Sequence, residues 1–147
     1  MDTAILDVNA LMRMSQEQLD DLYRASLAGP IPSGEGQGTV LIAPRTAVAE
    51  TAARLIHLLA WQGKVFDPDK GELRNEVLPI GLRAVIAQVY KGPSWFDSRE
   101  SIVLDYSRTS LIAHWIRDEI REVAPGLYLG IVYWNHDKLI NFALTFS

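Results

Sequence analysis

The sequence predicts a mainly β (α+β) fold, in which one antiparallel sheet of about eight strands curls into a barrel and two helices flank or cap it. Three observations support this fold. Short runs of aromatic and β-branched residues fill the last third of the chain, turn residues separate these runs, and two amphipathic segments stand closer to the N-terminus. The concave side of such a sheet must hold side chains or a guest molecule.

Composition places the chain among globular proteins with one domain, residues 1–147. Hydrophobic residues make up 48% and charged residues 22%, and the formal net charge is −4. No basic patch is visible, so we expect no nucleic-acid partner. The absence of cysteine excludes disulfides, zinc-thiolate sites, iron–sulfur clusters and a cysteine nucleophile.

The start of the chain carries Asp2 and Asp7, where a secretory signal would have basic residues. The longest apolar stretch, 55–61, is far shorter than the ~20 residues that span a membrane. We therefore expect a cytoplasmic protein that is not inserted in a membrane.

Two helices are predicted. After an N-terminal arm at 1–14, Ser15 and Gln18 form a capping box that starts a helix over 15–28, and Gly29-Pro30 ends it. A second helix, 46–62, begins at a Thr46 cap and is inserted in the barrel region 39–146.

Strands account for most of the remaining chain. The glycines and prolines of 30–38 predict an irregular connector, and 39–43 predicts a short strand. Further strands are expected at the following ranges: 64–67, 72–77, 82–90, 99–106, 127–134 and 139–146. Turns are expected at Lys91–Ser94 and at Asn135-His136-Asp137.

The segment 107–123 fits two descriptions. Leu111, Ile112, Trp115 and Ile116 have helical spacing, yet 115–123 can also pair as a strand whose charged residues alternate. We favour a short helical turn at 109–113 followed by a strand from Trp115.

The residues 91–97, 102–106 and 117–130, the last ending in Leu127-Tyr128-Leu129-Gly130, resemble a group of uncharacterised small bacterial proteins. That group is similar in turn to lipocalin-like (calycin-type) β-barrels, and the resemblance covers about residues 60–146. It implies a closed sheet with a cavity for a small apolar molecule. The Gly-x-Trp signature that opens true lipocalins is absent.

Asp105 is the first candidate site residue, because it shares a predicted strand face with Ser101 and Val103 among bulky apolar neighbours. A buried carboxylate must be paired or protonated. We hypothesise that Asp105 and an arginine form a polar floor that orients a ligand. The alternative is an exposed aspartate at a strand end that caps 107–109.

Five charges crowd into 117–122. On a strand, Arg117, Glu119 and Arg121 share one face, while Asp118 and Glu122 share the other. If the first set points inward, an arginine fork can clamp a carboxylate. The alternative is a set of solvated surface ion pairs.

Aromatic and polar side chains of the strands supply the remaining candidates. Most aromatics at alternate strand positions pack in a core, but some must line any cavity that the barrel encloses. The candidate ligand-binding residues are Tyr90, Trp95, Asp105, Tyr106, Trp115, Arg117, Glu119, Arg121, Tyr128 and Asn141.

Catalytic signals are weak. His114 near Asp105 can form an acid–base pair, which gives the only candidate catalytic residues. The three histidines lack metal-ligand spacing, and no cofactor motif is present, so we expect neither a metal nor a cofactor.

The sequence therefore predicts a binder of a small hydrophobic molecule, fatty-acid-like or terpenoid-like, in a barrel cavity. One alternative is a cofactor-free lyase or isomerase that uses the same cavity. Another is an interaction protein with a solid barrel, whose exposed apolar strands form a homodimer.

Overall fold

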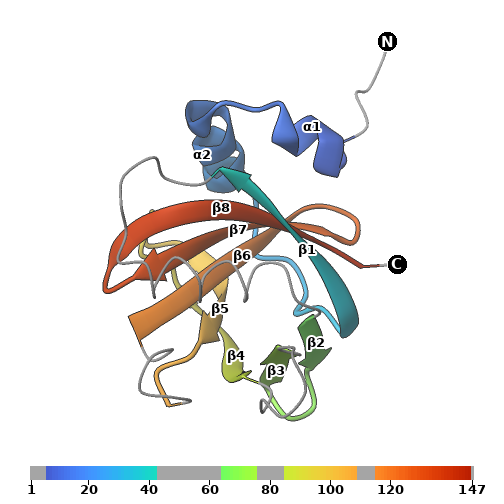
Figure 1. The fold of residues 1–147 in the computed structure, drawn as a ribbon, viewed down its shortest axis with the longest axis vertical. Helices are drawn as coiled ribbons and strands as arrows, with labels where there is room; N and C mark the ends of the chain where they lie inside the picture. The colour runs from blue at the N-terminus through green and yellow to red at the C-terminus, as the bar shows by residue number, and fades with distance from the viewer. Residues whose placement is uncertain (1–5, 43–63, 76–84, 109–114, 147) are drawn as a thin grey trace.

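The computed structural model describes residues 6–42, 64–75, 85–108 and 115–146, which form two short helices followed by eight antiparallel strands. The strands are β1 (Gly34–Ile42), β2 (Lys64–Asp67), β3 (Glu72–Asn75), β4 (Val85–Pro93), β5 (Glu100–Asp105), β6 (Ile116–Ala124), β7 (Leu127–Trp134) and β8 (Asp137–Thr145). Each strand pairs with the next along the chain, and the sheet closes into a barrel (Figure 1). The predicted mainly β barrel of about eight strands is confirmed.

The first strand closes the barrel by pairing at both of its ends. Gly34–Gly36 pair with β2, and Gln37–Ile42 pair with β8. The prediction of an irregular connector over 30–38 is therefore wrong for its second half. Gly36 lies against the ring of Phe146, which a side chain at this position would displace, so the glycine serves close packing inside a strand.

Two strand boundaries also differ from the prediction. β4 continues to Pro93, which pairs with Glu100, whereas a turn was predicted at Lys91–Ser94. Pro93 is the last residue of its strand, a position where the missing N–H does not interrupt a ladder. The second boundary is the start of β8, because Asp137, which was predicted in the turn, pairs with Trp134 as the first residue of that strand. The β7–β8 turn is therefore Asn135-His136, and both residues have positive φ, 49° and 74°.

The helices are α1 (Val8–Met12) and α2 (Gln16–Ala25), which lie on one side of the barrel (Figure 1). The predicted capping box is present, because Ser15 accepts from the N–H of Gln18 and the Gln18 side chain accepts from the N–H of Ser15. α1 falls in the segment predicted as an arm. The predicted helix 46–62 lies outside the described residues.

Apolar side chains form two clusters, one on each face of the curled sheet. The interior cluster draws on alternate residues, such as Ile102 and Leu104 of β5 and Ile116 and Ile120 of β6. The outer cluster joins both helices to the outward residues of β7, among them Leu129 and Ile131. The barrel wall is therefore buried on both sides beneath the helices.

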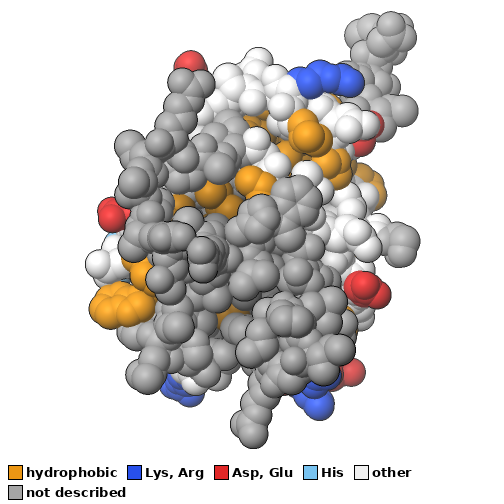
Figure 2. All heavy atoms as spheres, in the orientation of Figure 1, with side chains coloured by type: hydrophobic (Ala, Val, Ile, Leu, Met, Phe, Trp, Pro, Cys, Tyr) orange, Lys and Arg blue, Asp and Glu red, His pale blue; other side chains and the backbone are white. Residues whose placement is uncertain are grey.

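The ambiguous segment 115–123 forms a strand, as favoured by the sequence. β6 pairs with β7 along most of its length and with β5 over Arg117–Ile120, with Glu119 opposite both Val103 and Ile131. The helical turn predicted at 109–113 lies outside the described residues. On the face shown in Figure 2, the charged side chains of the described residues are scattered singly around the rim.

Replacement of Gly130 by alanine tests the packing of the barrel interior. A Cβ at Gly130 would overlap the ring of Phe142, which is buried and directly opposite on β8. We expect Gly130→Ala to lower the free energy of unfolding by about 1–3 kcal/mol in urea denaturation.

Gly92→Ala is the matched control, because its Cβ would meet Tyr90 at an ordinary 3.4 Å and its neighbours need not move. The double variant Gly130→Ala/Phe142→Leu should recover part of the loss, since the smaller side chain vacates the space. Equal stabilities of Gly130→Ala and Gly92→Ala would contradict this account of the interior.

Candidate functional site

The structure separates the sequence-predicted site residues into three places. Tyr106 and Tyr128 belong to the interior cluster. Glu119, Arg121 and Asn141 are buried on the outer side of the wall, where they contact residues of α2. The remaining candidates gather around a surface pocket: Tyr90, Trp95, Asp105, Trp115 and Arg117. The other catalytic candidate, His114, lies outside the described residues.

The side chain of Glu119 is fully buried where β6 packs against the β4–β5 turn. One carboxylate oxygen accepts hydrogen bonds from the hydroxyls of Ser94 and Tyr23, and the other accepts from the N–H of Trp95 at 2.8 Å and from Arg117 at 3.2 Å. A buried carboxylate is stable only when such donors replace water. Glu119 thus fixes the position of the turn that carries Trp95.

Arg121 is also fully buried, and the five N–H groups of its guanidinium match five acceptors. Nε donates to the carbonyl of Glu100, Nη1 to the carbonyl of Tyr23 and to Asp97, and Nη2 to Asp97 and to the carbonyl of Arg99. The guanidinium also lies 4.3 Å from the centre of the Tyr23 ring. Arg121 therefore ties α2 and the β4–β5 turn to the barrel.

These contacts rule out both descriptions of the charged strand, the inward-facing arginine clamp and the set of solvated surface ion pairs. Arg117, Glu119 and Arg121 do share one face, but that face is outside the barrel, because Ile116 and Ile120 point inward. The arginines are not solvated surface pairs either, since the side chains of Arg117 and Arg121 are 16% and 0% exposed. They form a buried network beneath α2.

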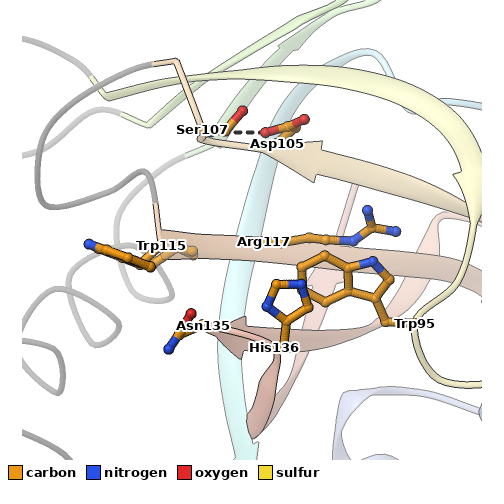
Figure 3. A pocket seen from close by; sticks show the side chains of 8 residues that line it. Trp95, Asp105, Ser107, Trp115, Arg117, Asn135 and His136 are labelled. Carbon is orange, nitrogen blue, oxygen red and sulfur yellow. Dashed lines mark hydrogen bonds between the residues drawn. The ribbon is translucent and has the colours of Figure 1, made fainter.

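The surface pocket lies at the end of the barrel where β5 ends, β6 begins and β7 turns into β8 (Figure 3). It has a volume of about 290 Å³. Its lining residues are Trp95, Asp105, Ser107, Trp115, Ile116, Arg117, Asn135 and His136. Figure 3 shows Trp115 on one side and the Trp95–His136 stack on the other, with the Arg117 guanidinium beside the Trp95 ring and Asp105 on the neighbouring strand.

Trp95 is held by three neighbours although 43% of it is exposed. The imidazole of His136 stacks on the indole at 4.3 Å and 12°, and the guanidinium of Arg117 lies 4.3 Å from the ring centre. The ring of Tyr133 meets the indole edge-on at 5.2 Å. These contacts give a partly exposed indole one orientation.

Asp105 lies on the outer surface of the barrel rather than on a polar floor inside it, because Leu104 and Tyr106 occupy the inward positions. Its carboxylate accepts from the Tyr90 hydroxyl at 2.8 Å and from the N–H of Ser107 at 2.9 Å. The alternative of a strand-end aspartate thus describes its position. Desolvation raises the pKa of Asp105. The hydrogen bonds from Ser107 and Tyr90 and the charge of Arg117 together lower this pKa by more than desolvation raises it, so the net shift is downward.

The inner wall holds two ionisable groups that the sequence did not single out. Lys64 and Asp118 are 1% and 2% exposed, and Asp118 alternates with the inward-facing Ile116 and Ile120. Burial lowers the pKa of Lys64 and raises the pKa of Asp118, and their mutual attraction offsets part of each shift. Among the described residues, Oδ1 of Asp118 is a buried side-chain atom without a hydrogen-bond partner.

One signal in the sequence could have found Asp118. Strand alternation already places it on the face opposite Arg117, Glu119 and Arg121, so an outward position for that set implies an inward position for Asp118. For Lys64 no comparable signal exists, because the short strand Lys64–Asp67 carries one apolar residue on each face, Val65 on one and Phe66 on the other, so the sequence does not indicate which face points inward.

No cluster of three or more histidine or carboxylate side chains that could hold a metal ion occurs in the part of the chain that the structure describes. Neither helix within the described ranges is long and apolar enough to cross a membrane.

Comparison with protein-family models and with curated proteins gave no match. Among solved structures, a protein from Thermomonospora curvata is similar, with a TM-score of 0.58 and 16% sequence identity. The superposition covers 91% of this chain and 88% of that chain. At this identity the similarity shows a shared fold alone, and kinship with the lipocalin-like proteins stays a prediction.

Arg121→Lys tests the buried network. A lysine cannot reproduce the planar fork that serves Asp97 and three carbonyl groups, so buried acceptors lose their partners. We expect a loss of about 3 kcal/mol or more in urea denaturation. Arg99→Lys is the control, because the Arg99 side chain is 53% exposed and should change stability by less than about 0.5 kcal/mol. Similar effects of the two substitutions would refute the role of Arg121.

Asp97→Asn tests the charge of the same network through pH. The hydrogen bonds from Arg121 lower the pKa of Asp97 from its ordinary value of 3.8 to about 2. The ionised carboxylate therefore stabilises the fold above about pH 4, and this stabilisation is lost as the pH falls towards 2. We expect the wild type to exceed Asp97→Asn by about 1–2 kcal/mol at pH 7 and the difference to shrink below pH 4. A difference that is constant over this range would contradict the assignment.

Proposed function

We propose that this protein binds a small, largely apolar molecule, fatty-acid-like or terpenoid-like, inside the barrel, with Asp118 and Lys64 holding its polar end. The observation that supports the proposal is the buried Asp118 oxygen that has no hydrogen-bond partner among the described residues. Almost all buried polar atoms in native proteins have a partner, so a ligand group or an ordered water is expected there.

The chemistry of the inner wall favours such a guest. Aliphatic and aromatic side chains of the interior cluster, including Val89, Leu104 and Val132, offer apolar surface, which contributes roughly 25 cal/mol per Å² that is removed from water. A hydroxyl or carboxyl group at the end of the guest can donate to or accept from Asp118, and a carboxylate can pair with Lys64. An eight-stranded barrel is wide enough for one small ligand.

Of the groups predicted to orient the ligand, Tyr106 and Tyr128 lie in the interior cluster. Asp105, Arg117 and Arg121 lie outside this cluster. In the proposal, Lys64 and Asp118 orient the polar end of the ligand in their place. The hydroxyl of Tyr128 already donates to the carbonyl of Pro30 at 2.7 Å, so this tyrosine contributes its ring rather than its hydroxyl.

The alternatives remain predictions. The lyase or isomerase hypothesis relied on His114 together with Asp105, and no observation on the described residues favours that pair. The hypothesis of a solid barrel that acts by interaction is distinguished from ligand binding by the experiment below.

A double substitution separates a functional from a structural role of the buried charges. Lys64→Met/Asp118→Leu removes both groups and keeps the interior apolar, so we expect equal or greater stability against urea. We also expect at least about a tenfold loss of affinity for palmitate or farnesol, measured by displacement of anilinonaphthalene sulfonate. These two probes distinguish a carboxylate-bearing guest from a hydroxyl-bearing guest.

Ile140→Val is the matched control, because it changes an interior side chain without changing charge. It should leave the affinity within a factor of about two. Native mass spectrometry of protein purified from cells should show a co-purifying molecule of lipid mass. No bound species together with no affinity for either probe would support the solid barrel and end the proposal.

A further inference from the structure

At the surface pocket, a histidine occupies a backbone conformation that packing alone does not require. His136 adopts φ 74°, in the left-handed region, at the second position of the two-residue β7–β8 turn. Glycine is the usual residue there, because an L side chain makes this conformation less favourable. The exposed imidazole nevertheless stands in this position and stacks on Trp95 at the pocket wall. Unfavourable backbone conformations of this kind are often retained at binding sites.

Exposed aromatic surface concentrates around the same pocket. Three large exposed hydrophobic residues lie at this pocket. Trp95 and Trp115 line it, and the hydroxyl of Tyr90 donates to its Asp105. Their exposed fractions are 40%, 43% and 46%. Side chains of this size seldom stay so exposed together unless they meet a partner.

The charges of the pocket select among possible guests. The guanidinium of Arg117 already lies against the Trp95 ring, so a cationic guest would be repelled from the aromatic wall. The carboxylate of Asp105 stands opposite Arg117 in the β5–β6 ladder and disfavours a strongly anionic guest. A neutral guest fits this pair of opposite charges.

The polar groups of the rim can still form hydrogen bonds. Nη1 of Arg117 and the side-chain amide of Asn135 have no partner among the described residues, and a carboxylate such as Asp105 accepts more than the bonds it receives from Tyr90 and Ser107. Donors and acceptors therefore surround the aromatic wall from several directions. Hydroxyl groups, which both donate and accept, match such a rim better than a planar base, whose polar groups lie in one plane.

We propose that this pocket is a second binding site, separate from the barrel interior, and that it takes a neutral sugar ring. The apolar C–H face of the sugar would lie on the Trp115 and His136 side chains, since aromatic faces carry partial negative charge. Its hydroxyl groups would bond to Asp105, Asn135 and Arg117. The volume of about 290 Å³ accommodates one ring with part of a second.

His136→Gly and Asn135→Gly test the proposal without endangering the fold. Both positions have positive φ, so glycine should keep or raise the melting temperature while it removes a side chain from the pocket. Binding would be measured by tryptophan fluorescence and by ¹⁵N NMR titration. The probes are glucose, galactose, mannose, N-acetylglucosamine and their β-linked disaccharides, with adenosine, benzoate and tetramethylammonium for comparison.

We expect the wild type to bind at least one of the sugars and none of the comparison compounds. His136→Gly and Trp115→Ala should each weaken that binding about tenfold. Leu27→Ala, which removes a 78% exposed apolar side chain elsewhere on the surface, should leave the affinity unchanged. Lys64→Met/Asp118→Leu should also leave it unchanged, which separates this site from the interior one.

Several outcomes would overturn the proposal. These are binding of adenosine, benzoate or tetramethylammonium in preference to every sugar, absence of any sugar binding, or sugar binding that survives both His136→Gly and Trp115→Ala. The melting temperature of each variant shows whether lost binding reflects the pocket or the fold.

Discussion

The alternation of side chains along β6 from Ile116 to Glu122 is the constraint on which the rest of the molecule depends. Ladders on both edges fix its register, with Glu119 opposite Val103 of β5 and Ile131 of β7. A slip by one residue would turn Arg117, Glu119 and Arg121 into the barrel and expel the inward isoleucines. In the observed register, Glu119 and Arg121 on the outer side have hydrogen-bond partners for all their polar atoms. On the inner side, Asp118 lies near Lys64 and keeps one oxygen without a hydrogen-bond partner among the described residues.

The buried outer network also couples the barrel wall to the surface pocket. Glu119 accepts from the main-chain N–H of Trp95, and Arg117 donates to Glu119 while it lies against the Trp95 ring. The indole orientation is thus set by a carboxylate that solvent does not reach. A binding wall built in this way is preorganised, which lowers the entropy lost when a ligand is bound.

The local signals in the sequence were sufficient for most of the fold. The capping box at Ser15 and the alternating runs of β5 to β8 depend on neighbours in the chain, and each is present in the structure. The start of β1 was not predictable, because Gly36 is needed for the approach of Phe146, a residue more than a hundred positions away in the sequence. From composition alone, a segment this rich in glycine is predicted to be a loop.

Some residues of the surface pocket were among the sequence-based candidates, but their arrangement was not predictable. Tyr90, Trp95, Asp105, Trp115 and Arg117 do lie near one another, but on the outer surface. The direction in which a strand face points depends on which face the helices cover, and that is a property of the whole sheet. For the same reason, the inward position of Asp118 follows from the sequence only once the outward face of β6 is known, and the sequence gives no sign of the position of Lys64.

Closure of the sheet has a consequence for how the chain folds. The ladder between β1 and β8 joins the first and last strands, so the ring of hydrogen bonds is complete only after the C-terminal residues have docked. Contacts so distant in sequence make folding slow, and an incomplete ring exposes two unpaired strand edges. Loss of a few C-terminal residues would therefore leave a protein prone to aggregation, although the remaining hairpins are themselves intact.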